Sequence, residues 1–300
     1  MNPADPQPQP NPAAHLAARP AAGRAETSRV AVSRPVAERL ADGGMDGVNA
    51  EGGGARAFGV VTGELPAGPA NSIVDVAGVS VGHVTIADGD LQTGVTAVLP
   101  HARNLFRDKV PAACRVINGF GKSAGLVQVE ELGTIESPIL LSNTFAVAAC
   151  LDGGLDALLA ENPDIATTTG SANVVALECN DGYLSDMRRR AVTPAHVRRA
   201  VEAARESAGS PFRRGAVGAG RGMSCYGLKG GIGTASRLAG GYVVGALLLT
   251  NFGRLSELVV DGRRVGREIV ALGAGDAADT GSATSRSEEH TSELQSPNTI

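Results

Sequence analysis

Three glycine-rich stretches carry the residue types that hold phosphate groups in nucleotide-binding proteins. The first, "NGFGKSAG", contains Gly121-Lys122-Ser123, but a P-loop also needs an earlier glycine at the position of Val116. The second, "GGIGTASR" at 230–237, has Ser236 where the dinucleotide fingerprint has its third glycine. The third, "GAVGAGRGM" at 215–223, spaces its glycines at alternate positions. This spacing favours structural turns, and a nucleotide-binding protein that uses ATP or NAD is the weaker alternative.

The four cysteines could in principle bind a metal. They are Cys114, Cys150, Cys179 and Cys225, and no two of them form a CxxC pair. Structural zinc sites need clustered ligands, so this spacing predicts no metal site. We expect free thiols in a reducing compartment.

Composition and charge argue against several classes of partner. The length of 300 residues suffices for one large domain or two small ones, and a hydrophobic content of 43% suffices for an ordinary buried core. Aromatic residues make up only 3%, and the lack of tryptophan argues against stacking platforms for single-stranded nucleic acid. A net charge of −4 gives no general attraction to phosphate backbones. We therefore expect a soluble globular protein with no nucleic-acid partner.

Neither a membrane anchor nor a secretory signal is evident. The longest apolar run, "YVVGALLLT" at 242–250, is too short to span a bilayer. The start, "MNPADPQPQPNPAAH", lacks the basic residues and apolar stretch of a signal peptide. These features predict no membrane partner and a cytoplasmic location.

The pattern of apolar residues predicts several strands after a Pro/Ala/Gly-rich extension at 1–55, which we expect to be disordered. Gly78 and Gly82 are expected to break the region 71–86 into short strands. The run at 137–144 is nearly continuous and predicts a strand buried on both faces. Further predicted strands are 93–100, a central strand within 240–253, and a hairpin at 258–265 with Asp261-Gly262 at its turn.

Two helices are predicted between these strands. One covers 146–162, with a Gly-Gly interruption, and the other runs from Pro194 to about Ala208. Thr193 can cap the second helix, and Pro194 suits its first turn. Its apolar face is Val197, Ala200, Val201, Ala204 and Ala208. Because strands and helices alternate without a clean βαβ rhythm, the sequence favours a layered α+β fold over a doubly wound parallel sheet.

Six blocks of sequence point to a specific family. They are "NSIVDVAGVSVGHVTI", "GVTAVLPH", "DKVPAACRVINGFGKSAGLVQVEELGTIESPILLSNT", "ECNDGYLSD", "GAVGAGRGMSCYGLKGGIGTASR" and "VVGALLLTNFG". Their order resembles that of the DmpA-type aminopeptidases, which include the L-aminopeptidase/D-esterase-amidases and the β-peptidyl aminopeptidases. The resemblance runs from about residue 56 to Ser282.

The resemblance implies an αββα sandwich, an α+β fold made as an inactive precursor. In this family the precursor cuts itself before a serine, whose hydroxyl is then the catalytic nucleophile and whose freed α-amine is a plausible base beside it. The matching bond here is Gly281–Ser282. Glycine tolerates the twisted backbone that lets a neighbouring hydroxyl attack its carbonyl. Alone, a Gly-Ser pair in a polar stretch is typical of a linker.

Other roles carry over residue by residue. Asn251 of "TNFG" matches an active-site asparagine that stabilises an oxyanion, and otherwise it would cap a turn. Glu178 of "ECNDG" matches the carboxylate that receives the substrate's ammonium, and otherwise it is an exposed loop acid. Asn180 stands where some members have an active-site tyrosine, so its catalytic contact is left open. The family gives histidine no catalytic part, so His83 is expected to be structural.

The tail differs from the family pattern. After Ser282-Ala283-Thr284-Ser285 the chain reads "RSEEHTSELQS", which is similar to the translation of a short-read sequencing adapter. We therefore expect 56–281 to be the α-subunit, 282–285 the start of a truncated β-subunit, and 286–300 to be foreign sequence. A genuine polar C-terminus is the alternative. On this hypothesis the chain as printed is inactive and lacks the strands that complete its fold.

For the intact parent, the resemblance implies a self-cleaving serine aminopeptidase or amidase acting on small peptides, amides or esters with a free amino group. It needs no metal or organic cofactor and forms an oligomer of αβ units. An amide hydrolase of 6-aminohexanoate-type oligomers is a second possibility. A non-catalytic scaffold is a third.

Overall fold

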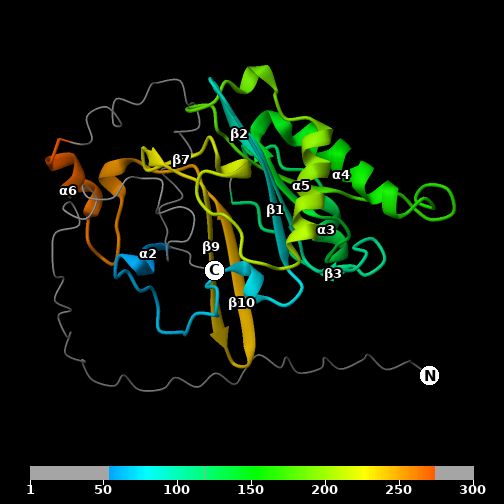
Figure 1. The fold of residues 1–300 in the computed structure, drawn as a ribbon, viewed down its shortest axis with the longest axis horizontal. Coiled ribbons are helices and arrows are strands. Elements are labelled where there is room, and N and C mark those ends of the chain that lie inside the picture. The colour runs from blue at the N-terminus through cyan, green and yellow to red at the C-terminus, as the bar shows by residue number, and fades with distance from the viewer. Residues whose placement is uncertain (1–53, 118, 274–300) are drawn as a thin grey trace, which may run out of the picture. The chain divides into compact units, whose positions relative to one another are not determined.

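The computed structural model describes residues 54–117 and 119–273 (Figure 1). The predicted disorder at 1–55 lies outside these residues except at the start of the first helix, and Gly281, Ser282 and the tail lie outside them altogether. The helices (α), 3₁₀ turns (η) and strands (β) are, in chain order, α2 Gly54–Ala57, η1 Ile73–Asp75, β1 Ser80–Asp88, β2 Leu91–Leu99, β3 Val110–Pro111, α3 Leu126–Leu132, β4 Thr134–Ile135, β5 Ile139–Asn143, η2 Thr144–Ala146, α4 Val147–Glu161, β6 Val175–Cys179, η3 Met187–Arg189, α5 Pro194–Ser207, η4 Gly218–Gly220, β7 Ser224–Cys225, β8 Leu228–Lys229, β9 Ile232–Ala239, β10 Tyr242–Leu249, η5 Leu255–Glu257 and α6 Val265–Ala271.

Four strands form the main sheet, in the order β1-β2-β5-β6. The pairs β1–β2 and β2–β5 are antiparallel, whereas β5 and β6 are parallel, with Asn143 opposite Cys179. A parallel pair needs a crossover, and α4 supplies it. The strands expected at 93–100 and 137–144 are confirmed as β2 and the largely buried β5. Helices and sheets together confirm the α+β class.

Helices α4 and α5 pack against each other, and α5 also packs on β1 and β2 (Figure 1). The helix predicted from Pro194 is confirmed as α5. Ala208, expected on its apolar face, is exposed and follows the last turn with a left-handed φ of 47°. The core beneath these helices includes Val95, Ala97, Leu140, Cys150, Val197, Ala200, Val201 and Ala204.

Gly82 lies inside β1 and does not break it, so the prediction of short strands separated there is wrong. A Cβ at residue 82 would lie 2.2 Å from the Ala204 nitrogen and 2.3 Å from the Ala200 oxygen. The glycine therefore lets the backbone of α5 approach the strand closely. Gly78, with φ of 88°, is the glycine that turns the chain before β1.

Strands β9 and β10 form a separate antiparallel ribbon. Leu247 packs against a second core cluster of Val79, Val81 and Val98. The opposite face of β10 remains exposed and is largely apolar, consisting of Tyr242, Val244, Ala246 and Leu248. The segment 240–253 was expected to hold a central strand, but among the described residues β10 pairs with β9 alone. We call this exposed set the outer face of β10.

Of the hairpin predicted at 258–265, the turn at Asp261-Gly262 is confirmed, but no strands of the described chain flank it and α6 begins at Val265. Both residues have left-handed φ angles, 49° and 75°, and Val260 bridges Arg263 across the turn. Helix α6, which follows immediately, was not predicted. Within 54–117 and 119–273, no helix has the length and apolar character needed to cross a membrane.

Candidate active site

The candidate site lies where β5, β6 and β10 end. Thr144 follows β5 directly, Glu178 is the penultimate residue of β6, and Asn180 comes just after β6. Because the carboxyl ends of parallel strands meet at one sheet edge, Thr144 and Glu178 are neighbours. Asn251 follows β10 and reaches the same place from the ribbon.

Both carboxylate oxygens of Glu178 are hydrogen-bonded. The backbone N–H of Lys122 donates to Oε1 at 2.9 Å, and the hydroxyl of Thr144 donates to Oε2 at 2.6 Å. The residue is half-buried. Each carboxylate oxygen can accept more than one hydrogen bond. Both oxygens of the oriented Glu178 carboxylate can therefore still accept from a cationic donor.

The side chain of Asn251 is hydrogen-bonded to the backbone of Asn180. The Asn251 side-chain amide donates to the Asn180 carbonyl oxygen, and the Asn180 side chain accepts from the Gly182 N–H at 2.8 Å. A carboxamide nitrogen carries two hydrogens, so this bond orients Asn251 and leaves a second donor on the same nitrogen. Both asparagines are exposed.

An aromatic pair holds the chain after Asn251. The backbone N–H of Tyr226 donates to the Phe252 carbonyl at 2.7 Å, and the two rings meet edge to face with centroids 5.0 Å apart. A Cβ at Gly253 would lie 2.5 Å from the Tyr226 ring, so a larger residue there would displace the ring. This contact restricts where Asn251 can lie.

Asp181 follows Asn180 directly and is buried. It is 1% exposed, and among the described residues neither carboxylate oxygen meets a donor in hydrogen-bonding geometry. Burial raises the pKa of Asp181 to about 6, and the polar side chains of Thr93 and Asn143 oppose part of that rise. Sequence inspection did not single out this residue.

His83 lies on β1 and makes two hydrogen bonds that suit the expected structural role. Its Nδ1 is 2.9 Å from the Thr96 hydroxyl, and its Nε2 is 3.1 Å from the Arg213 carbonyl oxygen. Since a carbonyl only accepts, Nε2 carries the hydrogen and Nδ1 accepts from Thr96. Burial lowers the pKa of His83 to about 4, which keeps the ring neutral at ordinary pH.

The Gly121-Lys122-Ser123 loop does not have the geometry of a phosphate cradle. Lys122 contributes its backbone amide to Glu178, while its ammonium donates to the Phe120 carbonyl at 2.8 Å and lies 3.8 Å from the Phe120 ring centroid. No helix begins at the loop; α3 starts at Leu126. The loop delivers a donor to a carboxylate.

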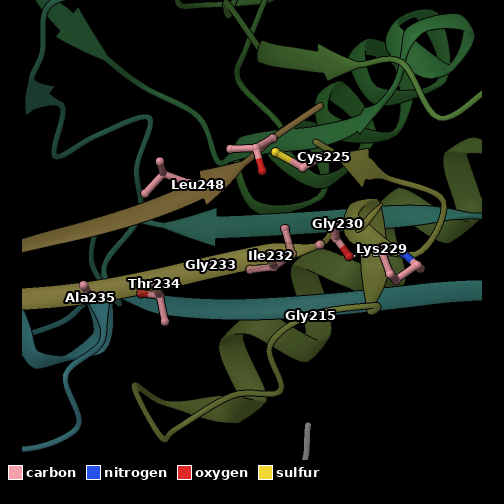
Figure 2. Close-up of a pocket in the computed structure, with 11 residues that line it drawn as sticks. Gly215, Cys225, Lys229, Gly230, Ile232, Gly233, Thr234, Ala235 and Leu248 are labelled. Carbon is pink, nitrogen blue, oxygen red and sulfur yellow. Dashed lines mark hydrogen bonds between the residues drawn. The ribbon is translucent and has the colours of Figure 1, made fainter. Parts of the chain in front are cut away.

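A cavity of about 490 Å³ adjoins the end of β10. Figure 2 shows Ile232, Gly233 and Leu248 beside it, and its wall includes Thr250, the residue before Asn251. The fingerprint-like stretch 230–237 therefore forms one wall of the cavity and runs into strand β9, with no helix N-terminus behind it.

Lys229 is the charged residue of that cavity wall. Its ammonium donates to the carbonyls of Met223 and Gly230, at 3.0 and 3.2 Å. Burial lowers the pKa of Lys229. Because its hydrogens are directed to backbone carbonyls, this lysine ties the end of β8 to Met223, the residue before β7.

The predicted nucleophile and cleavage bond, Ser282 and Gly281, lie outside the described residues. The structure therefore brings together Glu178, Asn180 and Asn251 and does not place the serine. Over 54–117 and 119–273, no group of three or more His, Cys, Asp or Glu residues is arranged to hold a metal ion.

Comparison with known proteins identifies the family. Peptidase family S58 matches residues 71–285. The β-peptidyl aminopeptidase BapA of Sphingosinicella microcystinivorans is 38% identical over 234 residues, which cover 74% of this chain. The chain belongs to Peptidase family S58, and the predicted resemblance to DmpA-type aminopeptidases is confirmed.

Solved structures support the fold. The PH0078 protein from Pyrococcus horikoshii OT3 is 46% identical with a TM-score of 0.70, over 74% of this chain and 65% of that one. The L-aminopeptidase D-Ala-esterase/amidase from Ochrobactrum anthropi is 32% identical with a TM-score of 0.65, over 72% and 62% of the two chains. That structure is described as a new variant of the Ntn hydrolase fold. This chain spans 57% of the length of the Sphingosinicella relative.

Sequence inspection missed Thr144 and the Lys122 amide as partners of Glu178. One signal was present: "LLSNT" and "VALECN" are runs that begin with apolar residues and end in polar ones. Had these two strands been recognised as parallel neighbours, Thr144 and Glu178 would have been placed together. No local signal marks a backbone N–H as a ligand.

Proposed function

We propose that the complete protein is a self-processing serine aminopeptidase or amidase that releases N-terminal residues from peptides, amides or esters. The convergence of the Glu178 carboxylate and the Asn251 amide at one sheet edge carries this proposal. The first group suits a substrate ammonium and the second a developing oxyanion. Membership of Peptidase family S58 and the names of the relatives support the same conclusion.

Maturation would begin at Gly281–Ser282. The Ser282 hydroxyl attacks the Gly281 carbonyl, the C–N bond is replaced by a C–O ester bond, and water then hydrolyses the ester. Ser282 is left with a free α-amine, whose ordinary pKa lies near 8, so that it can accept a proton near neutral pH. Such an amine is a base next to its own hydroxyl.

Turnover would use the same serine. Glu178 holds the substrate's ammonium, so that the carbonyl of the terminal residue faces the Ser282 hydroxyl. The hydroxyl adds to that carbonyl, its proton passes to the α-amine, and Asn251 donates to the oxyanion. The leaving amine takes the proton as the C–N bond breaks, and water then releases the acyl group. The Asn180 carbonyl orients Asn251 throughout.

The substrate class follows from the amine site and from the relatives. A carboxylate that binds a free ammonium accepts α- or β-amino acid residues, and the Sphingosinicella relative is named a β-peptidyl aminopeptidase. We place β-amino acyl amides first among candidate substrates. We also place the protein in the cytoplasm, because all four cysteines are free thiols, and assign it an oligomer of processed units.

The test uses the complete reading frame. We expect purified protein to be cut before Ser282, as mass spectrometry of the two fragments would show, and to hydrolyse β-alanyl or alanyl p-nitroanilide. Ser282→Ala should abolish both. A 6-aminohexanoyl anilide turned over in preference to these would favour the oligomer-hydrolase alternative. Stabilisation by ATP or NAD without anilide turnover would favour the nucleotide-binding alternative.

We further propose that residues 282–285 begin the β-subunit and that 286–300 are adapter-derived. Sequencing the locus from an independent genomic sample tests this. The proposal expects a natural frame that diverges from the printed sequence after Ser285. Recovery of the same tail would overturn it.

A further inference from the structure

The orientation of the Glu178 carboxylate is set by two neighbours from different parts of the chain. The Lys122 N–H approaches Oε1 from 56 residues earlier in the chain, and the Thr144 hydroxyl approaches Oε2 from 34 residues earlier. An ionised carboxylate only accepts hydrogen bonds, so the Thr144 hydroxyl must donate its proton to Oε2. With one donor on each oxygen, rotation of the carboxylate about its last bond would break a hydrogen bond.

Thr144 is itself fixed by buried groups beneath it. Asn143, 3% exposed, accepts from the Phe145 N–H at 3.0 Å and so caps the 3₁₀ turn η2 that begins with Thr144. Its amide also donates to the Thr93 hydroxyl at 2.8 Å, and Thr93 is 2% exposed. The backbone position of Thr144 is therefore determined by packing inside the sheet.

We propose that Thr144 is a positioning residue for the substrate's amino group, acting through Glu178. This inference rests on the proposed function and deepens it. By holding Oε2, Thr144 directs the remaining lone pairs of both oxygens to one place, where a primary ammonium can donate to them. The arrangement selects substrates with an unblocked amine.

The hydrogen bond to Glu178 also explains why threonine suits position 144. A serine could make the same hydrogen bond, but the β-branched threonine has fewer side-chain rotamers and holds its hydroxyl with less loss of entropy. Valine has the same shape and no donor. The series Thr, Ser and Val at position 144 therefore separates shape from hydrogen bonding.

The experiment compares two esters with the complete, processed enzyme. Alanine methyl ester carries the ammonium and methyl propionate lacks it, and acid release in a pH-stat measures both. We expect Thr144→Val to lower kcat/KM for the alanine ester about tenfold, mainly through KM, because a charge-assisted hydrogen bond is lost. Turnover of methyl propionate should change by less than about twofold, since that substrate makes no use of the carboxylate. Thr144→Ser should restore the alanine ester to within about threefold of wild type.

Controls separate this effect from damage to the fold. Thr168→Val replaces an exposed threonine in the loop after α4 and should leave both esters unchanged. Thr144→Ala serves as a second variant if the valine variant is poorly folded by thermal unfolding. Equal losses on both esters, or no loss on either, would overturn the positioning role. If unaltered enzyme is neither processed nor active on either ester, the proposed function fails and this inference with it.

Discussion

Asp181 combines almost complete burial with a carboxylate that lacks a hydrogen-bond donor among the described residues. It follows Asn180 directly, so its charge state bears on the loop whose carbonyl receives the Asn251 amide. An unpaired buried carboxylate favours its protonated form. The buried Asp181 carboxyl therefore lowers the free energy of unfolding at neutral pH.

The stability of the folded protein should depend on pH through this residue. The folded pKa is about 6, against an ordinary value of 3.8. Below about pH 3 the group is protonated in both states and has almost no effect. Between the two pKa values the unfolded chain releases a proton that the folded chain retains, so stability falls as pH rises, and above about pH 6 the loss is complete.

Asp181→Asn removes this dependence. We expect the variant to exceed the parent in free energy of unfolding by about 3 kcal/mol at pH 7.5 and by almost nothing at about pH 3. Urea unfolding at the two pH values measures the difference. A difference of the same size at both values would mean that Asp181 does not titrate in this range.

A second prediction concerns Asn251 in the complete enzyme. Removing one oxyanion donor costs about a hundredfold to a thousandfold in kcat, and we expect Asn251→Ala to show that loss with KM nearly unchanged. Asn180→Ala should be milder, because the backbone carbonyl that orients Asn251 remains. Steady-state kinetics on an aminoacyl p-nitroanilide measures both. An Asn180 effect as large as that of Asn251 would give the Asn180 side chain a direct catalytic part.

At the scale of elements, the contact between β1 and α5 depends on the missing side chain of Gly82. A methyl group there would overlap the backbone at Ala200 and Ala204. Backbone atoms cannot move aside as a flexible side chain can. The helix would have to shift away from the sheet and open the core cluster beneath it.

We therefore expect Gly82→Ala to lower the free energy of unfolding by about 3 kcal/mol. Gly170→Ala is the matched control, because no atom lies within 4 Å of a Cβ at that position and its φ is not left-handed. Denaturant unfolding of both variants measures the costs. If both variants lowered the free energy of unfolding by the same small amount, α5 would be shown to adjust without strain.

The ribbon gives a second prediction, since consecutive leucines of β10 have different surroundings. Leu247 packs on the cluster of Val79, Val81 and Val98, whereas Leu248 is 51% exposed on the outer face of β10. In the printed chain we expect Leu247→Ala to lower the free energy of unfolding by about 2 kcal/mol and Leu248→Ala to lower it by less than about 1 kcal/mol.

The same pair also bears on self-association, because a sheet face with contiguous exposed apolar side chains promotes it. Leu248→Thr should therefore reduce the aggregated fraction in light scattering, whereas Leu247→Thr should not. An unchanged fraction in Leu248→Thr would show that the outer face of β10 does not drive association.

At the scale of the whole molecule, the sequence predicted what depends on nearby residues. Helix α5 has a proline at its first position and apolar residues at helical spacing, and the turn at 261–262 has an Asp-Gly pair. Both signals lie within a few residues of the structure they specify. The candidate site was found only because whole blocks resemble a family, since Glu178 and Asn251 have no local pattern of their own.

What sequence reasoning missed depends on contacts between distant segments. Gly82 was taken for a strand break because the reason for a glycine there, the backbone of α5, comes more than a hundred residues later. Likewise β10 has the composition of a central strand, and composition does not tell how many neighbours a strand has. Thr144 was overlooked because its partner lies on another strand.

The two hydrogen-bond donors to Glu178 have a consequence during synthesis and folding of the chain. Segments 34 and 56 residues away from the acid must come together before its carboxylate is oriented. On the proposed function, a chain still emerging from the ribosome, or one that has lost its fold, would have no oriented carboxylate to receive a free amino terminus. On that proposal, hydrolysis at the amino termini of other chains would begin only after folding is complete.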